Sequence, residues 1–308
     1  MFPGANASRE EAAYVVVGAP LDVSTTFRPG ARFGPDRIRL LAETFDDYDH
    51  RTAKRFSELA VHDHGNVRAW DDAQDYLDYL EGTLRDVVWD DAVPLLLGGE
   101  HTVTRAGVRA VDPDVFVCVD AHLDLRSEYD GNPWSHATVT RHVLDVVDEA
   151  IVLGARTGSE EEWERASEAD VTVVPPADVR DWLTAVADGD GNGFETESVY
   201  LSVDVDGVDP GFAPGTGTME PFGLAPREVR DVVRLVAPST VGFDVVEVND
   251  RDHGQTAALA GKLVREFVYA HAARGGRARG TVGRSTGESE AAPGETDGRS
   301  ATDTDEPR

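Results

Sequence analysis

The sequence predicts an α/β protein, a three-layer α/β/α sandwich with a mostly parallel central sheet. Two observations support this fold. Short, continuously apolar runs recur along the chain, which is typical of parallel strands buried on both faces. Segments with helical periodicity lie between these runs, and such alternation indicates βαβ units. The 308 residues are enough for one large domain of this kind.

Seven apolar runs are predicted to form the strands of the sheet. In chain order they are 14–20, 93–99, 115–120, 150–156, 171–176, 199–205 and 241–248. In 71–90, apolar residues such as Tyr76, Leu80 and Leu84 recur at helical spacing, and 256–271 has the same periodicity. Both segments are therefore predicted to be helices.

No linker interrupts this alternation, so we expect a single domain over 1–272. From 273 to 308 the only bulky aliphatic residue is Val282. That composition cannot bury enough apolar surface to offset the entropy of ordering, which predicts a disordered acidic and polar tail over 273–308. The stretch GDGNG at 189–193 is predicted to be a loop.

Acidic residues outnumber basic ones by 58 to 29, which gives a net charge of −29. Such a surface repels nucleic acid and anionic membranes, so we expect neither as a partner. The acidity is spread along the whole chain, which favours a solvated surface suited to a high-salt cytoplasm over a cationic partner. The single cysteine, Cys118, excludes an intramolecular disulfide and favours the reducing cytoplasm. We expect no transmembrane helix and no signal peptide.

The stretch FVCVDAHLDLR at 116–126 places Asp120, His122 and Asp124 at alternate positions after an apolar run. In a regular strand these side chains would share one face. If the strand ends near Asp120, the other two leave on a loop close to its carboxyl end. Either way, charged groups at the end of a buried strand need a partner.

Other predicted strands end in the same kind of residue. His101 follows the run at 93–99, Asp204 and Asp206 end the run at 199–205, and Glu247 lies at the end of 241–248. Open α/β sheets bind ligands at the carboxyl ends of their strands. We therefore expect two histidines and four aspartates to converge at one edge of the sheet.

This set of residues predicts a metal site. Four neighbouring carboxylates cannot all stay ionised without a counter-charge, and no lysine lies nearby in the sequence. Two divalent cations would supply that charge. Imidazole with mostly carboxylate oxygen suits manganese, with zinc or iron as alternatives. A pair of such ions can lower the pKa of a shared water and produce a hydroxide nucleophile.

The motifs resemble those of the ureohydrolases, the arginase-like metallohydrolases, from about Val15 to Ala270. The blocks that carry the resemblance are GAPLDVSTTFRPGARFGPDRIR (18–39), LLLGGEHTVT (95–104), VDAHLDLR (119–126), GNPWSHATVTR (131–141), LSVDVDGVDPGFAPGTGTMEPFGL (201–224) and GFDVVEVNDRDHGQTAALAGKL (242–263). RPGARFGP and DPGFAPGTGT are more similar to the agmatine-cleaving members than to arginases. The resemblance implies the arginase-like fold and a homo-oligomer, a trimer or a hexamer.

The resemblance also implies two manganese ions per chain. One would be held by His101, Asp120, Asp124 and Asp204. The other would be held by Asp120, His122, Asp204 and Asp206, so that Asp120 and Asp204 bridge the two ions. These roles come from matching the family's motifs to this sequence.

Three residues are expected to act on the substrate. By resemblance, Glu247 holds a guanidinium group, His136 shuttles protons, and Asp124 orients the hydroxide and passes its proton to the leaving amine. The expected reaction hydrolyses a small cationic guanidino compound to urea and a primary amine, with agmatine, which yields putrescine, favoured. Guanidinobutyrate, aminopropylagmatine, formiminoglutamate and arginine are alternatives. A two-metal phosphoesterase and a non-catalytic relative are less favoured.

For several other residues a structural role is favoured. His62 and His64 stand at alternate positions, but no carboxylate-rich segment accompanies them. His253 is expected at the rim of the site. Cys118 is expected to be a buried apolar residue rather than a nucleophile.

Glu100 is predicted to support its neighbouring ligand rather than to bind metal. Trp134 could either line the pocket or pack its own loop. Three places differ from the usual pattern of the family: Ala137, the segment 221–224 and the segment 249–252. We expect these differences to concern the tail of the substrate rather than the metals.

Overall fold

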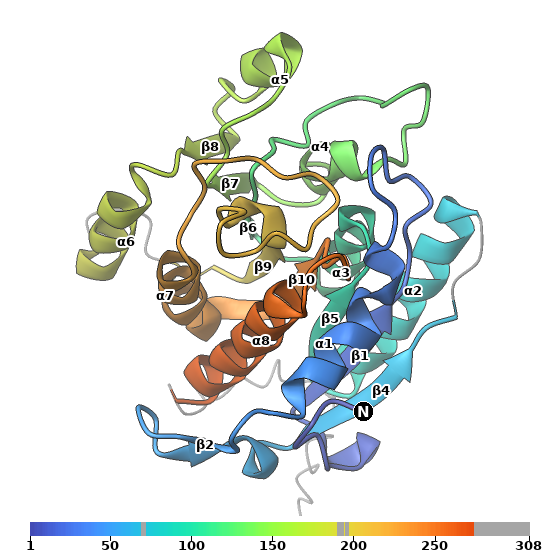
Figure 1. Cartoon of the computed structure of the whole chain (residues 1–308), viewed down its shortest axis with the longest axis vertical. Helices are drawn as coiled ribbons and strands as arrows, with labels where there is room; N and C mark the ends of the chain where they lie inside the picture. The colour runs from blue at the N-terminus through green and yellow to red at the C-terminus, as the bar shows by residue number, and fades with distance from the viewer. Residues whose placement is uncertain (69–71, 190–193, 195–196, 274–308) are drawn as a thin grey trace, which may run out of the picture. The chain divides into compact units, whose positions relative to one another are not determined.

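The computed structural model describes residues 1–68, 72–189, 194 and 197–273 (Figure 1). The predicted tail at 273–308 and the predicted loop at 189–193 lie outside this range, apart from the first residue of each. Among the described helices, none is long and apolar enough to cross a membrane.

Eight strands form one sheet in the order β4-β1-β5-β10-β9-β6-β7-β8, and every pairing in it is parallel. The strands are β1 (Tyr14–Ala19), β4 (Val61–Asn66), β5 (Val93–Gly98), β6 (Val115–Val119), β7 (Glu149–Leu153), β8 (Val171–Val174), β9 (Val199–Asp204) and β10 (Thr240–Val246). A separate antiparallel pair joins β2 (Tyr48–Asp49) and β3 (Lys54–Arg55). All seven predicted strands are present, within a few residues at their ends.

In the eight-stranded sheet, the one strand that the sequence did not predict is β4, whose residues read VHDHGN. It lies at the edge of the sheet beside β1, and its residues are buried only in part. An edge strand does not need the continuous apolar run of a central strand, so the periodicity gave no signal here.

Helices connect the strands: α1 (Gly34–Ala42), α2 (Ala73–Trp89), α3 (Thr104–Val111), α4 (Val139–Val143), α5 (Glu160–Arg165), α6 (Val179–Asp188), α7 (Pro226–Val236) and α8 (Gln255–Ala273). Both predicted helices are among them, as α2 and α8. The first begins where the Asp72 side chain accepts a hydrogen bond from the backbone N–H of Asp75, a typical N-cap.

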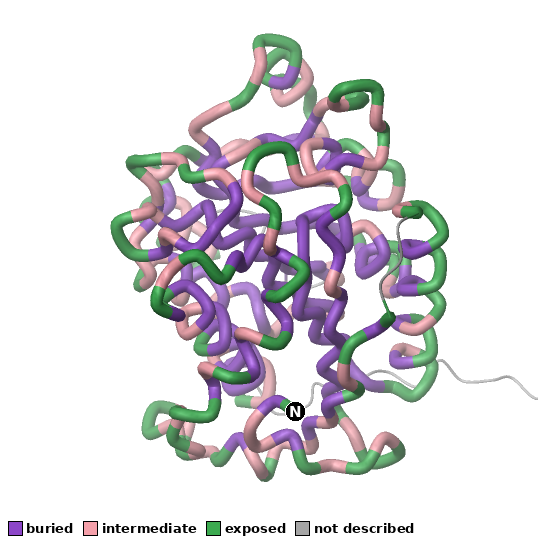
Figure 2. Tube along the Cα trace, turned by 45° about the vertical axis from the view of Figure 1, so that its right-hand side comes forward, coloured by how far each residue is buried: buried purple, intermediate pink, exposed green. Residues whose placement is uncertain are grey.

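Alternate strand residues pack on opposite faces of the sheet. Val16 belongs to a cluster with α1, α7 and α8, whereas Val15 and Val17 pack with α2 and α3. Figure 1 shows these two sets of helices on opposite sides of the strands, and Figure 2 shows the buried residues concentrated along the sheet. The predicted three-layer sandwich is therefore confirmed.

The order of the strands determines where a ligand can bind. Four neighbouring strands, β5, β10, β9 and β6, form the centre of the sheet. The chain passes from β5 to β6 and later places β9 and β10 between them. Such a change of direction opens a crevice at the carboxyl ends of the strands.

Candidate metal centre

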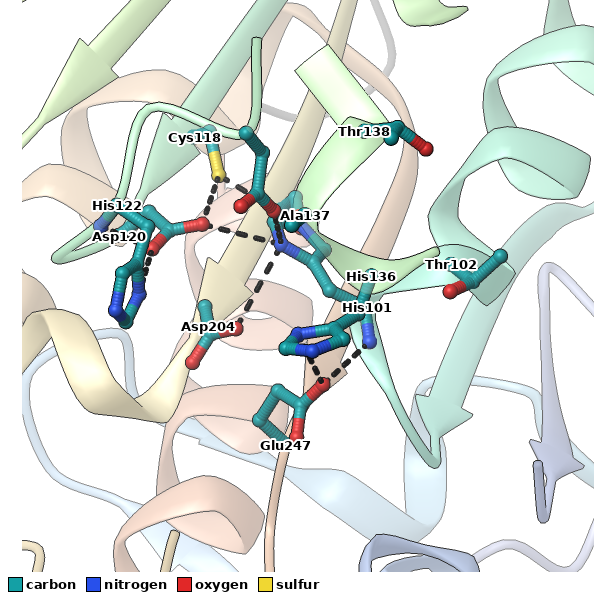
Figure 3. Close-up of polar contacts among 12 residues, drawn as sticks. His101, Thr102, Cys118, Asp120, His122, His136, Ala137, Thr138, Asp204 and Glu247 are labelled. Carbon is teal, nitrogen blue, oxygen red and sulfur yellow. Dashed lines mark hydrogen bonds and ion pairs between the residues drawn. The ribbon is translucent and has the colours of Figure 1, made fainter. Parts of the chain in front are cut away.

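The six predicted ligand residues all lie at the carboxyl edge of the central strands. They end or follow β5, β6 and β9 and are His101, Asp120, His122, Asp124, Asp204 and Asp206. Figure 3 shows the side chains of His101, Asp120 and Asp204 directed toward one another, with Glu247 beside His136. The structure thus brings the predicted residues together.

Asp120 connects two parts of this cluster. Because β6 ends at Val119, Asp120, His122 and Asp124 leave the sheet on a loop rather than sharing one strand face. Oδ2 of Asp120 lies 3.1 Å from Nδ1 of His101, while Oδ1 lies 3.5 Å from Nδ1 of His122. One buried carboxylate therefore faces two histidines.

We call His101 with Asp124 the inner group, and His122 with Asp206 the outer group. Nδ1 of His101 lies 3.0 Å from Oδ2 of Asp124 and 3.6 Å from Oδ2 of Asp204. In the outer group, Nδ1 of His122 lies 3.1 Å from Oδ2 of Asp206. The His101 side chain is fully buried, whereas that of His122 is 28% exposed. The outer group is thus closer to solvent.

Two functional candidates have an unusual backbone conformation. Asp124 has φ +52° and Glu247 has φ +61°, in the left-handed region that non-glycine residues rarely adopt. Hydrogen bonds hold Glu247 there, because its N–H donates to the carbonyl of Gly99 and its Oε1 accepts from the N–H of His101, both at 2.8 Å. Such conformations concentrate at functional sites. The sequence gave no signal of them.

The electrostatics of the cluster favour bound cations. Burial, reinforced by the charge of Asp120, raises the pKa of Asp124 to about 7. Burial together with neighbouring carboxylates raises the pKa of Asp204 well above its ordinary value. Within the described residues, the ion-pair partners of the aspartates are the imidazoles of His101 and His122. Imidazole nitrogens and carboxylates suit divalent metals, so the residues of this cluster fit bound divalent cations.

A chain of buried polar groups supports His101 from behind. Nε2 of His101 lies 3.2 Å from Oγ of Ser202, which donates to Oδ1 of Asp244 at 2.6 Å. The other oxygen of Asp244 accepts from the hydroxyl of Tyr200 at 2.8 Å. These contacts fix the ring with Nδ1 toward the carboxylates. Ser202 and Asp244 are polar residues inside apolar strands, and this pattern in the sequence is the signal of such a buried polar chain.

Cys118 is fully buried, as predicted, and burial raises the pKa of its thiol. Its Sγ lies 3.8 Å from Nε2 of His101 and 4.0 Å from Oδ2 of Asp120. The sequence did not predict this proximity. The thiol therefore lies beside two of the expected ligands, and His101, Cys118 and Asp120 form one of the groups in the described chain that could hold a metal ion.

A cavity of about 280 Å³ opens beside the outer group. Its walls include His122, Asp124 and His136, together with Arg126 and Glu162, which the sequence had not singled out as a pair. Nη2 of Arg126 lies 3.1 Å from Oε2 of Glu162. The walls of the cavity therefore include both metal candidates and an ion pair in which Glu162 is buried and Arg126 is partly exposed.

His136 lies between the cavity and the Glu247 carboxylate. Its Nδ1 is 4.0 Å from Oε1 of Glu247, and its Nε2 is 3.3 Å from Oγ1 of Thr26. Burial, followed by the charges of His122 and His101, lowers the pKa of His136 to about 4. A neutral imidazole at this place can accept or release a proton.

The other candidates have the following places. His62 and His64 lie on β4, away from the cluster, and Nδ1 of His62 is 3.0 Å from the carbonyl of Ala7. His253 is exposed. Trp134 packs its own loop, since its ring stacks on His142 at 5.2 Å and Arg105 lies over it at 3.9 Å.

Glu100 is fully buried behind the cluster, and its Oε2 accepts a hydrogen bond from the N–H of Ser24 at 2.8 Å. Burial raises its pKa to about 7. Glu100 thus anchors a neighbouring loop, and its side-chain hydrogen bond does not go to an expected ligand.

The three departures from the family pattern also have different places. Ala137 lines the cavity. Phe222 has φ +69° and is 87% exposed. The segment 249–252 supports neighbouring loops: Asn249 Nδ2 donates to the carbonyl of Arg28, and Arg251 Nη2 donates to that of Pro29.

Comparison with known proteins identifies the family of the chain. The model of the arginase family matches residues 12–269. An agmatinase of Bacillus cereus is 35% identical, covering 87% of this chain and 95% of the relative. An N(1)-aminopropylagmatine ureohydrolase of Thermococcus kodakarensis is also 35% identical, covering 83% and 89%. The crystal structure of the agmatine ureohydrolase of Thermoplasma volcanium superposes with a TM-score of 0.82 at 34% identity, covering 88% and 94%. The chain therefore belongs to the arginase family, as its motifs predicted.

Proposed function

We propose that this protein is a manganese-dependent ureohydrolase that cleaves agmatine to putrescine and urea. The observation that carries the proposal is the pair of histidine–carboxylate groups joined by Asp120, beside a cavity lined by His136, whose Nδ1 lies 4.0 Å from Oε1 of Glu247. The named activities of the relatives in Bacillus and Thermococcus support this reaction class.

The residues that would hold two manganese ions follow from this arrangement. One ion would take the inner group and the other the outer group, with Asp120 and Asp204 shared. Sharing of Asp204 is supported by two contacts: its Oδ2 lies 3.6 Å from Nδ1 of His101, and its Oδ1 accepts from the N–H of Asp206 at 2.9 Å. When bound, such ions make water a strong nucleophile near neutral pH.

Glu247 would hold the substrate. A buried carboxylate can accept two parallel hydrogen bonds from a planar guanidinium, which fixes the plane of the carbon to be attacked. Burial, together with the charge of Glu100, raises the pKa of Glu247 to about 8. A guanidinium beside it would favour the ionised form, so substrate binding and ionisation of Glu247 support each other.

The proton transfers would fall to two side chains at the cavity. Asp124 would accept a proton from the attacking water and pass it to the departing amine, and His136 would shuttle protons between the cavity and solvent. His136 suits this role because a neutral imidazole can take up a proton and release it again, and it lies 4.0 Å from the Glu247 carboxylate.

The far end of the cavity decides which tail is accepted. Arg126 pairs there with Glu162 and lies 5.4 Å from the ring centre of Tyr129. Glu162 and the ring would attract the amine of agmatine. Arg126 would instead attract a carboxylate tail, so guanidinobutyrate is the second candidate.

The test is a comparison of hydrolysis rates for agmatine, aminopropylagmatine, guanidinobutyrate, formiminoglutamate and arginine, with manganese at high salt. We expect the highest kcat/KM for agmatine. Glu247→Gln should lower it at least about 30-fold, because a buried charge pair with the substrate is lost, while the manganese content stays unchanged. Hydrolysis of a generic phosphate ester without hydrolysis of any of these five compounds would contradict the proposal.

A further inference from the structure

The side chain of Arg156, shortly after β7, is bound only to backbone carbonyl oxygens. Its five hydrogen bonds run from Nε to Pro221 (3.1 Å), from Nη1 to Gly154 (2.9 Å) and Gly207 (3.2 Å), and from Nη2 to Asp206 (2.8 Å) and Glu220 (2.6 Å). A guanidinium has five N–H donors in a fixed planar fork. Every donor of Arg156 is therefore used.

Four of these carbonyls belong to the two ends of one loop, which connects β9 to α7 (Figure 1). Asp206 and Gly207 lie at its beginning, and Glu220 and Pro221 lie near its end. A single side chain thus ties both ends of the loop together at the end of β7.

This loop carries the aspartate of the outer group. Asp206 Oδ2 accepts a hydrogen bond from Oγ1 of Thr218, in the same loop, at 3.0 Å. The backbone N–H of Arg156 also donates to the carbonyl of Ala121 at 2.9 Å, between Asp120 and His122. Arg156 therefore joins the two segments that supply the outer group.

The surrounding chain is shaped to admit this guanidinium. A Cβ atom on Gly223 would lie 2.6 Å from Nη2 of Arg156 and within 2.8 Å of backbone atoms of Asp209 and Gly207, so only glycine fits between the guanidinium and the loop. Gly154, which provides one of the acceptors, has φ +98°, a conformation that suits glycine.

From these contacts we infer that Arg156 is a positioning residue that sets the affinity of the outer group for the second metal ion. Arg156 would act by holding Asp206 and the loop around it, without touching ion or substrate. The inner group has a different support, since Ser202 and Asp244 lie behind His101. This inference rests on the proposed two-metal function.

Arg156→Lys gives the sharpest test, because lysine keeps the charge but offers three donors and no planar fork. Changes in groups that orient metal ligands typically weaken metal binding 10- to 100-fold. We expect one manganese ion to bind with wild-type affinity and the other to bind about 10-fold or more weakly. Urea release should recover as manganese is raised.

The measurement is a manganese titration of the full-length protein, followed by electron paramagnetic resonance. Wild type should develop the spectrum of a spin-coupled pair. At the same manganese concentration, Arg156→Lys should show the spectrum of an isolated ion. A general loss of stability would not separate the two ions in this way.

Arg265→Lys is the matched control, because Arg265 on α8 is also buried and also donates to backbone carbonyls, those of Asp46 and Pro3. It should bind both ions like wild type. If Arg156→Lys does not fold, Arg156→Gln decides, since a glutamine amide keeps a planar group with two N–H donors at this place. The same selective loss is expected.

Three outcomes would count against the inference, and they can be told apart. Wild-type affinity for both ions in Arg156→Lys, or in Arg156→Gln where that variant decides, overturns the role of Arg156 alone. Equal weakening of both ions overturns its selectivity. A wild-type chain that binds fewer than two ions overturns the proposed function and this inference together.

Discussion

Two regions of the same sheet bury carboxylates in opposite ways. On the edge strand β4, both oxygens of Asp63 accept hydrogen bonds from Arg39, at 2.9 Å from Nε and 2.8 Å from Nη2. At the centre, Asp120 and its neighbours have histidines as their ion-pair partners within the described chain. The chain thus supplies its own cation where the carboxylate is structural, and leaves room for bound cations at the site.

The pKa values follow the same division. Burial opposes ionisation of Asp63, but the hydrogen bond and charge of Arg39 hold its pKa below the ordinary value. At the centre, burial raises the pKa of Asp124 to about 7 and that of Glu247 to about 8. The buried carboxylate of the first region is stable in its ionised form. The carboxylates of the second region need protons or metal ions to offset their charge.

The largest effect is expected from Asp120→Ala, since this carboxylate faces both histidines. Manganese binding should be lost at both positions, and urea release should fall by more than about 100-fold, beyond the usual effect of changes outside the ligands. Metal content after gel filtration and the rate of urea release are the readouts. Asp170→Ala, at a surface pair with Arg165, is the control and should behave like wild type. If Asp120→Ala retained two manganese ions, Asp120 would not be needed to hold manganese at either position.

The next effect is on the pH dependence of the free energy of unfolding, with and without manganese. In the metal-free protein the raised pKa values of Asp124 and Glu247 mean that the folded state binds more protons than the unfolded state between about pH 4 and 7. The free energy of unfolding should therefore fall as pH rises through this window. Saturating manganese should remove that slope, because the ions replace the protons.

Chemical denaturation at several pH values, with manganese and with a chelator, measures this difference. The same slope in both conditions would mean that metal ions do not compensate the buried carboxylates. The Asp63 pair has the opposite sign: its stabilisation is present above the ordinary aspartate pKa and is lost as pH falls.

The smallest effect on catalysis is expected at the edge strand. Asp63→Asn leaves Arg39 buried without its counter-charge and should lower the free energy of unfolding by about 3 kcal/mol. Its kcat/KM and its manganese content should stay within twofold of wild type, about the precision of such assays. Denaturation at neutral pH and the urea assay test both parts. A loss of bound manganese would show that the two regions are coupled.

The central part of the fold, and the clustering of the expected ligand residues, could be predicted from the sequence. Buried parallel strands appear in the sequence as apolar runs. The expected ligands that follow them stand at short, regular spacings, as Asp120, His122 and Asp124 do. The edge strand β4 could not be predicted, because half-buried residues such as His62 and His64 carry no apolar periodicity.

Support from distant parts of the chain was the least predictable feature. The five carbonyls around Arg156 come from two segments of the chain, and carbonyl groups are the same in every residue. The left-handed backbone of Asp124 and Glu247 also depends on tertiary contacts rather than on residue type. Local sequence patterns contain neither kind of information.

The most direct test of the account is the number of manganese ions bound per chain. Wild-type protein, equilibrated with manganese at high salt and freed of unbound metal, should hold two ions per chain, and Asp63→Asn should hold the same number. Its unfolding should shift to lower denaturant when a chelator removes the ions. A wild-type chain that retains no metal, and whose stability a chelator leaves unchanged, would contradict the claim that bound cations compensate the central carboxylates.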